Sequence, residues 1–247
     1  MEDLTGTVAV VTGGSRGLGR EMVLAYAARG ADVVIASRKL DACELLADEI
    51  RAAHGVRALA VGCNVSDWTD CDALVERVYA EFGRVDILVN NAGLSPLYPS
   101  LEDVTEALWD KVIAVNLKGP YRLSAVIGAR MVDAGGGCIL NISSIASLSP
   151  DAHSLPYAAA KAGLNTLTEG FAQAYGPTVR VNGIICGLFD TDIALAWPDE
   201  FRSLAEQQIA LSRIGRPDEV VGAALYLTTE ASTYTTGALL RMDGGTR

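Results

Sequence analysis

Residues 7–19 read TVAVVTGGSRGLG, and they carry the strongest indication of the fold. Thr7–Val11 is a short run rich in valine, which is typical of a buried strand. From Gly17 to Arg29 apolar residues return at helical spacing, and Gly30 can end that helix. Glycines between a buried strand and a helix let the backbone approach a phosphate closely, and the helix start supplies free N–H groups. The stretch therefore predicts a strand, a phosphate-binding turn and a helix.

The spacing of the glycines distinguishes this turn from other phosphate-binding turns. Gly13, Gly17 and Gly19 form the pattern G-x-x-x-G-x-G, which differs from the commonest dinucleotide fingerprint. It is not a P-loop, because Arg20 and Glu21 stand where that motif requires Lys and Ser or Thr. A glycine-rich turn without a ligand stays an alternative on these residues alone.

Strand-like and helix-like segments alternate along the rest of the chain. Further strands are predicted at Val33–Ala36, Val56–Val61, Ile87–Val89, Cys138–Ile142, Val179–Ile185 and Leu239–Met242. Helices are predicted at Asp41–His54, Asp67–Phe82, Thr105–Ala134 with an interruption near Gly119-Pro120, Leu155–Tyr175, Phe201–Leu211 and Asp218–Thr229. This order predicts one α/β domain over residues 1–247, a doubly wound parallel sheet of about seven strands with helices on both faces. A (β/α)₈ barrel would alternate too, but the glycine cluster after the first strand favours the open, Rossmann-like sheet.

Composition excludes several classes of protein. Of the 247 residues, 50% are hydrophobic, which is too much for a disordered chain. Lys and Arg number 20 against 30 Asp and Glu, and the net charge of −10 argues against nucleic acid or an anionic membrane as partner. We find neither a signal peptide nor a span-length apolar run, and therefore expect a cytoplasmic protein. Five scattered cysteines and two histidines predict reduced thiols and no metal site.

The end of the second predicted strand bears on cofactor choice. A dinucleotide fold that uses NAD usually has a carboxylate there, whereas this chain has Ser37-Arg38-Lys39. Arginine can bind the 2′-phosphate of NADP through two hydrogen bonds, and Arg16 in the glycine turn could add a second positive charge. We expect NADP(H). A solvated basic loop end, or NAD(H) with Arg38 stacked on the adenine, are the alternatives.

A second set of residues points to proton transfer. Tyr157 and Lys161 are four residues apart in a predicted helix and share one face. A free tyrosine has a pKa of about 10, and a neighbouring ammonium lowers it by favouring the phenolate. Such a pair can exchange a proton with the oxygen of an alcohol or carbonyl. Ser144 follows the strand Cys138–Ile142, at the carboxyl end where sites form in this fold, and can hold that oxygen.

Short motifs run from Val8 to Gly245, nearly the whole chain. They are TGGSRGLG at Thr12–Gly19, NNAG at Asn90–Gly93, Asn116 within NLKG, NISS at Asn141–Ser144, YAAAK at Tyr157–Lys161, Thr236-Gly237 and DGG at Asp243–Gly245. In this set the chain resembles the short-chain dehydrogenase/reductase family, in particular 3-oxoacyl-reductase-like and secondary alcohol dehydrogenase members.

The resemblance implies a role for each matching residue. Tyr157 would be the general acid/base, Lys161 would bind the nicotinamide ribose and depress the tyrosine pKa, Ser144 would orient the substrate oxygen, and Asn116 would hold a water that links Lys161 to solvent. Residues implied to contact the cofactor are Gly13, Ser15, Arg16, Gly17, Leu18, Gly19, Ser37, Arg38, Asn64, Val65, Asn91, Ala92, Gly93, Tyr157, Lys161, Gly187, Phe189 and Thr191. Three positions depart from the family pattern. Asn64 replaces the usual Asp and would reach adenine through its carbonyl oxygen, Ala160 replaces Ser, and Cys186 replaces Pro.

The sequence says less about the substrate and the oligomeric state than about the cofactor. Leu94–Ser100, Ala146–Pro156 and Leu188–Leu211 should line a largely apolar pocket for a small alcohol or ketone, with His153 a solvent-facing residue. A catalytically silent NADP(H)-binding sensor or scaffold is the alternative function. Leu164, Leu167 and Phe171 on one predicted helix, together with the long apolar segment 105–134, suggest a partner surface. With the family resemblance, this predicts a homotetramer, with a dimer as fallback.

Overall fold

A computed structural model describes residues 3–191 and 199–246, which form a single parallel sheet. Its strands lie in the order β3-β2-β1-β4-β5-β6-β7, and every neighbouring pair is parallel. The strands are β1 Val8–Thr12, β2 Asp32–Ser37, β3 Ala58–Gly62, β4 Ile87–Asn90, β5 Gly137–Ser144, β6 Val179–Cys186 and β7 Leu239–Met242. This confirms the predicted doubly wound α/β sheet.

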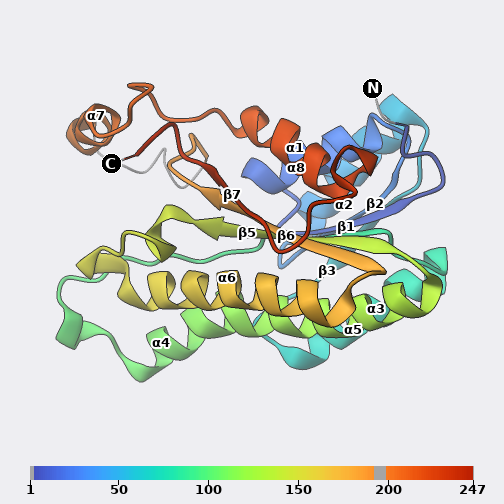
Figure 1. Ribbon diagram of the computed structural model, residues 1–247, viewed down its shortest axis with the longest axis horizontal. Coiled ribbons are helices and arrows are strands. Elements are labelled where there is room, and N and C mark those ends of the chain that lie inside the picture. The colour runs from blue at the N-terminus through green and yellow to red at the C-terminus, as the bar shows by residue number, and fades with distance from the viewer. Residues whose placement is uncertain (1–2, 192–198, 247) are drawn as a thin grey trace.

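Helices cover both faces of the sheet (Figure 1). On one face lie α1 (Gly17–Ala27), α2 (Leu40–His54) and α8 (Val220–Thr228), packed over one cluster of buried apolar side chains. On the other lie α3 (Trp68–Phe82), α5 (Gly119–Ala134) and α6 (Leu155–Tyr175), over a second cluster, with α4 (Glu106–Ile113) beside α6. The short helix α7 (Asp199–Gln207) stands apart from the sheet in Figure 1. Strands with apolar residues on both faces need this double cover, because either bare face would be exposed to water.

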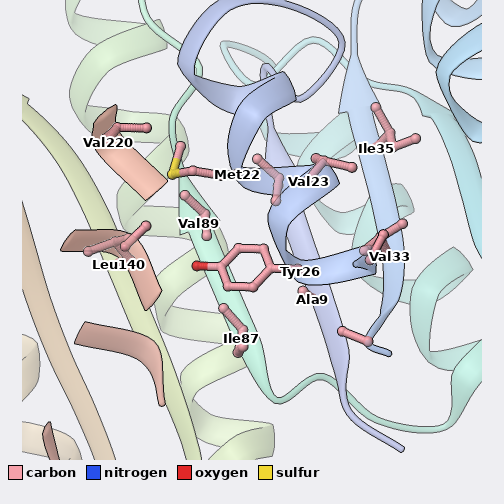
Figure 2. Close-up of a cluster of buried hydrophobic side chains, with 14 of the residues drawn as sticks. Ala9, Met22, Val23, Tyr26, Val33, Ile35, Ile87, Val89, Leu140 and Val220 are labelled. Atoms are coloured by element: carbon pink, nitrogen blue, oxygen red, sulfur yellow. The ribbon is translucent and has the colours of Figure 1, made fainter. Parts of the chain in front are cut away.

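The first cluster ties the amino-terminal helix to the sheet. Figure 2 shows the side chain of Tyr26 from α1 lying among Ala9, Ile87 and Val89 of β1 and β4. Its ring is completely buried, and its hydroxyl forms a hydrogen bond of 3.1 Å with Thr228 at the end of α8. The bond satisfies a polar group that would otherwise be costly to bury.

The chain order places a crevice at the centre of the sheet. The order reverses between β1 and β4, since the connections from β1 lead to one edge and those from β4 lead to the other. In open α/β sheets ligands bind at this reversal, beyond the carboxyl ends of the strands. Here the end of β1 leads into the glycine turn, β4 leads into Asn91-Ala92-Gly93, and β5 ends at Ser144.

Some predicted boundaries are wrong. The third strand begins at Ala58 rather than Val56, and the helix predicted at Phe201–Leu211 is α7, shifted toward the amino terminus. The predicted interruption near Gly119-Pro120 is a π-helical turn at Ala114–Lys118, which joins α4 to α5 and ends directly before Gly119. Pro120 lies in the first turn of α5.

Candidate active site

The glycine turn is tightly folded and close-packed. Gly13 and Gly17 have φ angles of 63° and 53°, which side chains other than glycine rarely adopt. A Cβ on Gly19 would lie 2.3 Å from the carbonyl oxygen of Gly13, so only glycine lets α1 start this close to the turn. The N-cap residue of α1 is Arg16, whose side chain makes no capping hydrogen bond, and Leu18 packs against the apolar cluster. The backbone N–H groups at the start of α1 are therefore suited to an anion.

The NNAG segment supports this turn from the side. The amide nitrogen of Asn91 donates to the carbonyl oxygens of Thr12, at 2.8 Å, and Gly13, at 3.2 Å. The hydroxyl of Thr12 in turn accepts hydrogen bonds from the backbone N–H groups of Asn91 and Ala92. Thr12 was outside the predicted site, although it opens the TGGSRGLG motif.

The end of β2 lies beside the glycine turn. The hydroxyl of Ser15 donates to the hydroxyl of Ser37 at 3.1 Å, which joins the two segments. Arg38 follows directly and is exposed, and no ion pair or hydrogen bond engages it within the residues described. A cationic side chain is thus held next to the turn without a neutralising carboxylate.

Asn64 is arranged differently from the prediction. Its side-chain oxygen accepts hydrogen bonds from the backbone N–H of Ser66, at 3.3 Å, and from the Ser66 hydroxyl, at 2.8 Å. The carbonyl oxygen expected to contact adenine is therefore already occupied within its own loop. The neighbouring Val65 is buried, and its backbone oxygen touches the start of α5 at Gly119.

Ser144, Tyr157 and Lys161 meet at the carboxyl end of β5. Ser144 is the last residue of that strand, and its hydroxyl lies close enough to Tyr157, in the first turn of α6, to act on the pKa of the phenol. The ammonium of Lys161 lies 5.7 Å from the centre of the Tyr157 ring and donates to the carbonyl oxygen of Ile142 at 2.7 Å. The helix spacing and the strand end together thus assemble the predicted trio.

The pKa values of Tyr157 and Lys161 are governed mainly by burial. Burial raises the pKa of Tyr157 to about 12, and the nearby Ser144 hydroxyl acts in the opposite direction. Burial also lowers the pKa of Lys161 to about 8. Desolvation is the largest influence on both groups, and the depression of the tyrosine pKa by Lys161 stays a prediction. At neutral pH Tyr157 is protonated and Lys161 is charged.

Asn116 lies in the π-helical turn and is completely buried. Its amide nitrogen donates to the carbonyl oxygens of Leu94, at 2.8 Å, and Val112, at 2.9 Å, and its oxygen accepts from the N–H of Leu94 at 3.2 Å. The side chain therefore holds the loop that follows Gly93. A Cβ on Gly93 would lie 3.3 Å from the Asn116 oxygen and 3.9 Å from the Lys161 ammonium, so Gly93 keeps the space beside Lys161 open.

The segment after β6 closes the site from the other side. A Cβ on Gly187 would lie 2.6 Å from the Cα of Asp243, so these backbones touch. Phe189 is buried, and Thr191 lies against the glycine turn, 3.3 Å from a Cβ placed on Gly17. Cys186 is buried, and burial raises the pKa of its thiol to about 12, as expected of an unreactive packed cysteine. Leu195 and Trp197 of the predicted substrate segment lie outside the described residues.

Exposed apolar side chains occur on the predicted substrate segments Leu94–Ser100 and Ala146–Pro156. Leu97 is 74% exposed, Leu148 is 53% exposed and Leu155 is 37% exposed. His153 is exposed, and its backbone N–H donates to Asp151. The residues described contain no group of acidic, cysteine or histidine side chains that could hold a metal ion. No described helix is long and apolar enough to cross a bilayer.

An open parallel sheet with a glycine turn at its point of reversal defines a doubly wound α/β protein of the dinucleotide-binding class. Residues 7–200 match the family model for short chain dehydrogenases. The chain is 35% identical over 245 residues to D-threitol dehydrogenase of Mycolicibacterium smegmatis, covering 98% of this chain and 93% of that protein. It belongs to the short-chain dehydrogenase family, and is an oxidoreductase acting on alcohols or ketones.

Solved structures agree with this assignment. NADPH-dependent 3-quinuclidinone reductase of Rhodotorula rubra superposes with a TM-score of 0.93 at 29% identity, covering 98% of this chain and 92% of that one. A 7α-hydroxysteroid dehydrogenase in complex with NADH superposes with a TM-score of 0.94 at 32% identity, covering 99% and 95%. The family binds nicotinamide dinucleotides. The name of the first neighbour gives NADPH, and that of the second gives NADH.

Proposed function

We propose that this protein is an NADP(H)-dependent oxidoreductase that interconverts a secondary alcohol and a ketone, with Tyr157 as general acid/base. The observation that carries the proposal is the meeting of Ser144, Tyr157 and Lys161 at the end of β5, on the same edge of the sheet as the glycine turn. A sensor or scaffold would need the turn but no proton-transfer group.

The residues present fit a dinucleotide. The glycine turn is a cradle that any Cβ on Gly13 or Gly19 would fill, since each would lie within 3.0 Å of neighbouring atoms. The uncapped start of α1 suits a pyrophosphate, and Gly93 leaves space beside Lys161 for a ribose. When bound, the cofactor supplies or accepts a hydride.

The chain's own residues then handle the proton. The Ser144 hydroxyl holds the substrate oxygen beside the Tyr157 hydroxyl, which donates a proton to that oxygen in ketone reduction and accepts one in alcohol oxidation. A pKa of about 12 keeps Tyr157 protonated at neutral pH, which suits proton donation. The Lys161 ammonium stabilises the phenolate that remains, and Ile142 orients the ammonium through its carbonyl oxygen.

The preference for NADP(H) rests on Arg38. It is an exposed guanidinium at the end of β2, adjacent to Ser37, whose hydroxyl is bonded to Ser15 of the glycine turn. A 2′-phosphate on the adenosine ribose would meet this cation, and a carboxylate in its place would repel the phosphate. NAD(H), with Arg38 stacked on the adenine, stays the alternative cofactor.

We also propose a largely apolar substrate and a homotetramer, with a dimer as fallback. Leu97 and Leu148 present apolar surface on the substrate segments. For assembly, Leu164 of the predicted stripe is buried and cannot meet a partner, and Leu167 and Phe171 are only partly exposed. Trp109 on α4 and Tyr121 on α5 are instead 45% and 43% exposed, and β7 is an edge strand with Leu240 partly exposed. Apolar surface of this kind usually meets another copy in a symmetric oligomer.

The decisive experiment replaces the proposed acid/base. Tyr157→Phe removes the transferable proton and keeps the ring, so we expect turnover of a ketone panel with NADPH to fall by at least about a hundred-fold. NADPH binding, followed by fluorescence, should stay within about two-fold of the wild type because the ring is retained. Near-normal turnover of the variant would refute the role of Tyr157. A wild type that binds NADPH but turns over nothing across the panel would refute the proposed activity.

A further inference from the structure

Helix α6 begins without a cap of its own. Its N-cap residue is Ser154, whose side chain makes no capping hydrogen bond, and Pro156 follows in the first turn. Helix starts leave several N–H groups without partners, and an uncapped first turn tends to fray. Tyr157 lies in this turn, two residues after the helix begins. The position of the proposed acid/base therefore depends on whatever holds the first turn.

A side chain from a distant loop supplies the missing partner. The hydroxyl of Tyr98, on the loop after β4, accepts a hydrogen bond from the backbone N–H of Leu155 at 2.8 Å. The same hydroxyl donates to the carbonyl oxygen of Ala152 at 2.8 Å. The Tyr98 hydroxyl thus donates one hydrogen bond and accepts another. Its partners are the first residue of α6 and a residue just before that helix. Tyr98 itself is only 7% exposed.

We infer that Tyr98 is a positioning residue that locks the first turn of α6, and with it Tyr157, to the loop 94–100. The inference rests on the proposed function, since it concerns the placement of the proposed acid/base. Ser144 lies near Tyr157 on the strand side, and Tyr98 holds the backbone at the start of its helix. Asn116 binds the backbone of Leu94 at the other end of the loop, so the loop has a fixed base.

The geometry also connects substrate binding to proton transfer. Leu97 precedes Tyr98 and is largely exposed, while Leu155, which Tyr98 caps, is partly exposed at the start of α6. A substrate that displaces the loop 94–100 would also move the hydroxyl that caps the helix of Tyr157. The chain thereby ties the seating of a substrate on this loop to the alignment of the acid/base.

The test removes one oxygen atom. In Tyr98→Phe the ring still fills its buried position, but the Leu155 N–H and the Ala152 carbonyl lose their shared partner. We expect kcat for ketone reduction to fall about ten-fold, the effect that loss of one helix cap has on a local equilibrium. The dissociation constant of NADPH should stay within about two-fold, because the hydroxyl that is removed bonds Ala152 and Leu155, and neither residue is among those expected to contact the cofactor.

A matched control separates positioning from stability. Tyr175 is the last residue of the same helix, and its hydroxyl donates to the carbonyl oxygen of Ala125 at 3.1 Å. Tyr175→Phe also deletes one phenol hydrogen bond, far along α6 from Tyr157. Both variants should lower Tm slightly, but only Tyr98→Phe should lower kcat. Equal kcat values for Tyr98→Phe and wild type would overturn the inference, as would an equal loss in both variants.

Hydrogen exchange gives a readout that needs neither turnover nor a folded variant. In the wild type the amide of Leu155 should exchange much more slowly than that of Leu40, the first residue of α2, which no side chain caps. Equal exchange rates would overturn the inference even if Tyr98→Phe fails to fold. Absence of wild-type turnover would instead refute the proposed function and leave the capping result standing.

Discussion

Gly19 is the position where one added methyl group tests the phosphate-binding turn most directly. A Cβ there would lie 2.3 Å from the oxygen of Gly13 and 2.5 Å from the amide nitrogen of Asn91, whereas ordinary contact begins at 3.4 Å. The added Cβ would therefore lie 1.1 Å closer to the Gly13 oxygen than ordinary contact allows (3.4 − 2.3 = 1.1 Å). Neither atom can move aside easily, because one is backbone and the other is bonded to Thr12 and Gly13.

Gly19→Ala must therefore push the start of α1 away from the turn by a distance of this order. Overpacking of this kind costs about 1–3 kcal/mol of stability. The N–H groups at the helix start move with α1, and a hydrogen bond lengthened by most of an ångström loses much of its strength. We expect the affinity for NADPH to fall at least ten-fold, which corresponds to about 1.4 kcal/mol of binding free energy.

The assay is a fluorescence titration with NADPH, together with thermal unfolding. Gly222 is the control, since it is a helical glycine of α8 with nothing within 4 Å of an added Cβ. Gly222→Ala should bind NADPH as the wild type does, and should gain up to about 1 kcal/mol in stability through better helix propensity. Wild-type affinity in Gly19→Ala would refute the reasoning, because the turn would then tolerate a clash that the packing forbids.

Three further predictions follow from the site and the surface. Arg38→Asp should raise the KM for NADPH about ten-fold or more and spare NADH, because a carboxylate repels the 2′-phosphate; a wild type that already prefers NADH would contradict the proposed cofactor. For ketone reduction, kcat/KM for NADPH reports the free enzyme and should fall as pH rises through about 8, where Lys161 loses its proton, whereas Lys161→Arg should stay active to higher pH. A profile that is flat through that range in the wild type would show that the charge of Lys161 is not needed. Light scattering should give about four times the mass of one chain, 25.9 kDa, and a single-chain mass would exclude the proposed assembly.

The fold could be predicted from the sequence because the patterns that indicate it are local. Valine-rich runs, helical spacing and the glycine turn all lie within a few residues of one another, and each is a property of the nearest neighbours in the sequence. The family motifs at Thr12–Gly19 and Tyr157–Lys161 are local in the same way. Helix boundaries were less certain: the π-helical turn at Ala114–Lys118 coincides with the burial of Asn116 against the loop after β4, a contact that no local pattern shows.

Residue type and period are enough to predict the sheet, the glycine turn and the spacing that brings Tyr157 and Lys161 onto one helix face. What surrounds these elements depends on the folded chain. Burial, not the nearby ammonium, governs the pKa of Tyr157, and the cap on its helix comes from Tyr98, a residue 57 positions away from Leu155. Desolvation and long-range hydrogen bonds depend on which distant segments pack together, and that information appears only when the chain is folded.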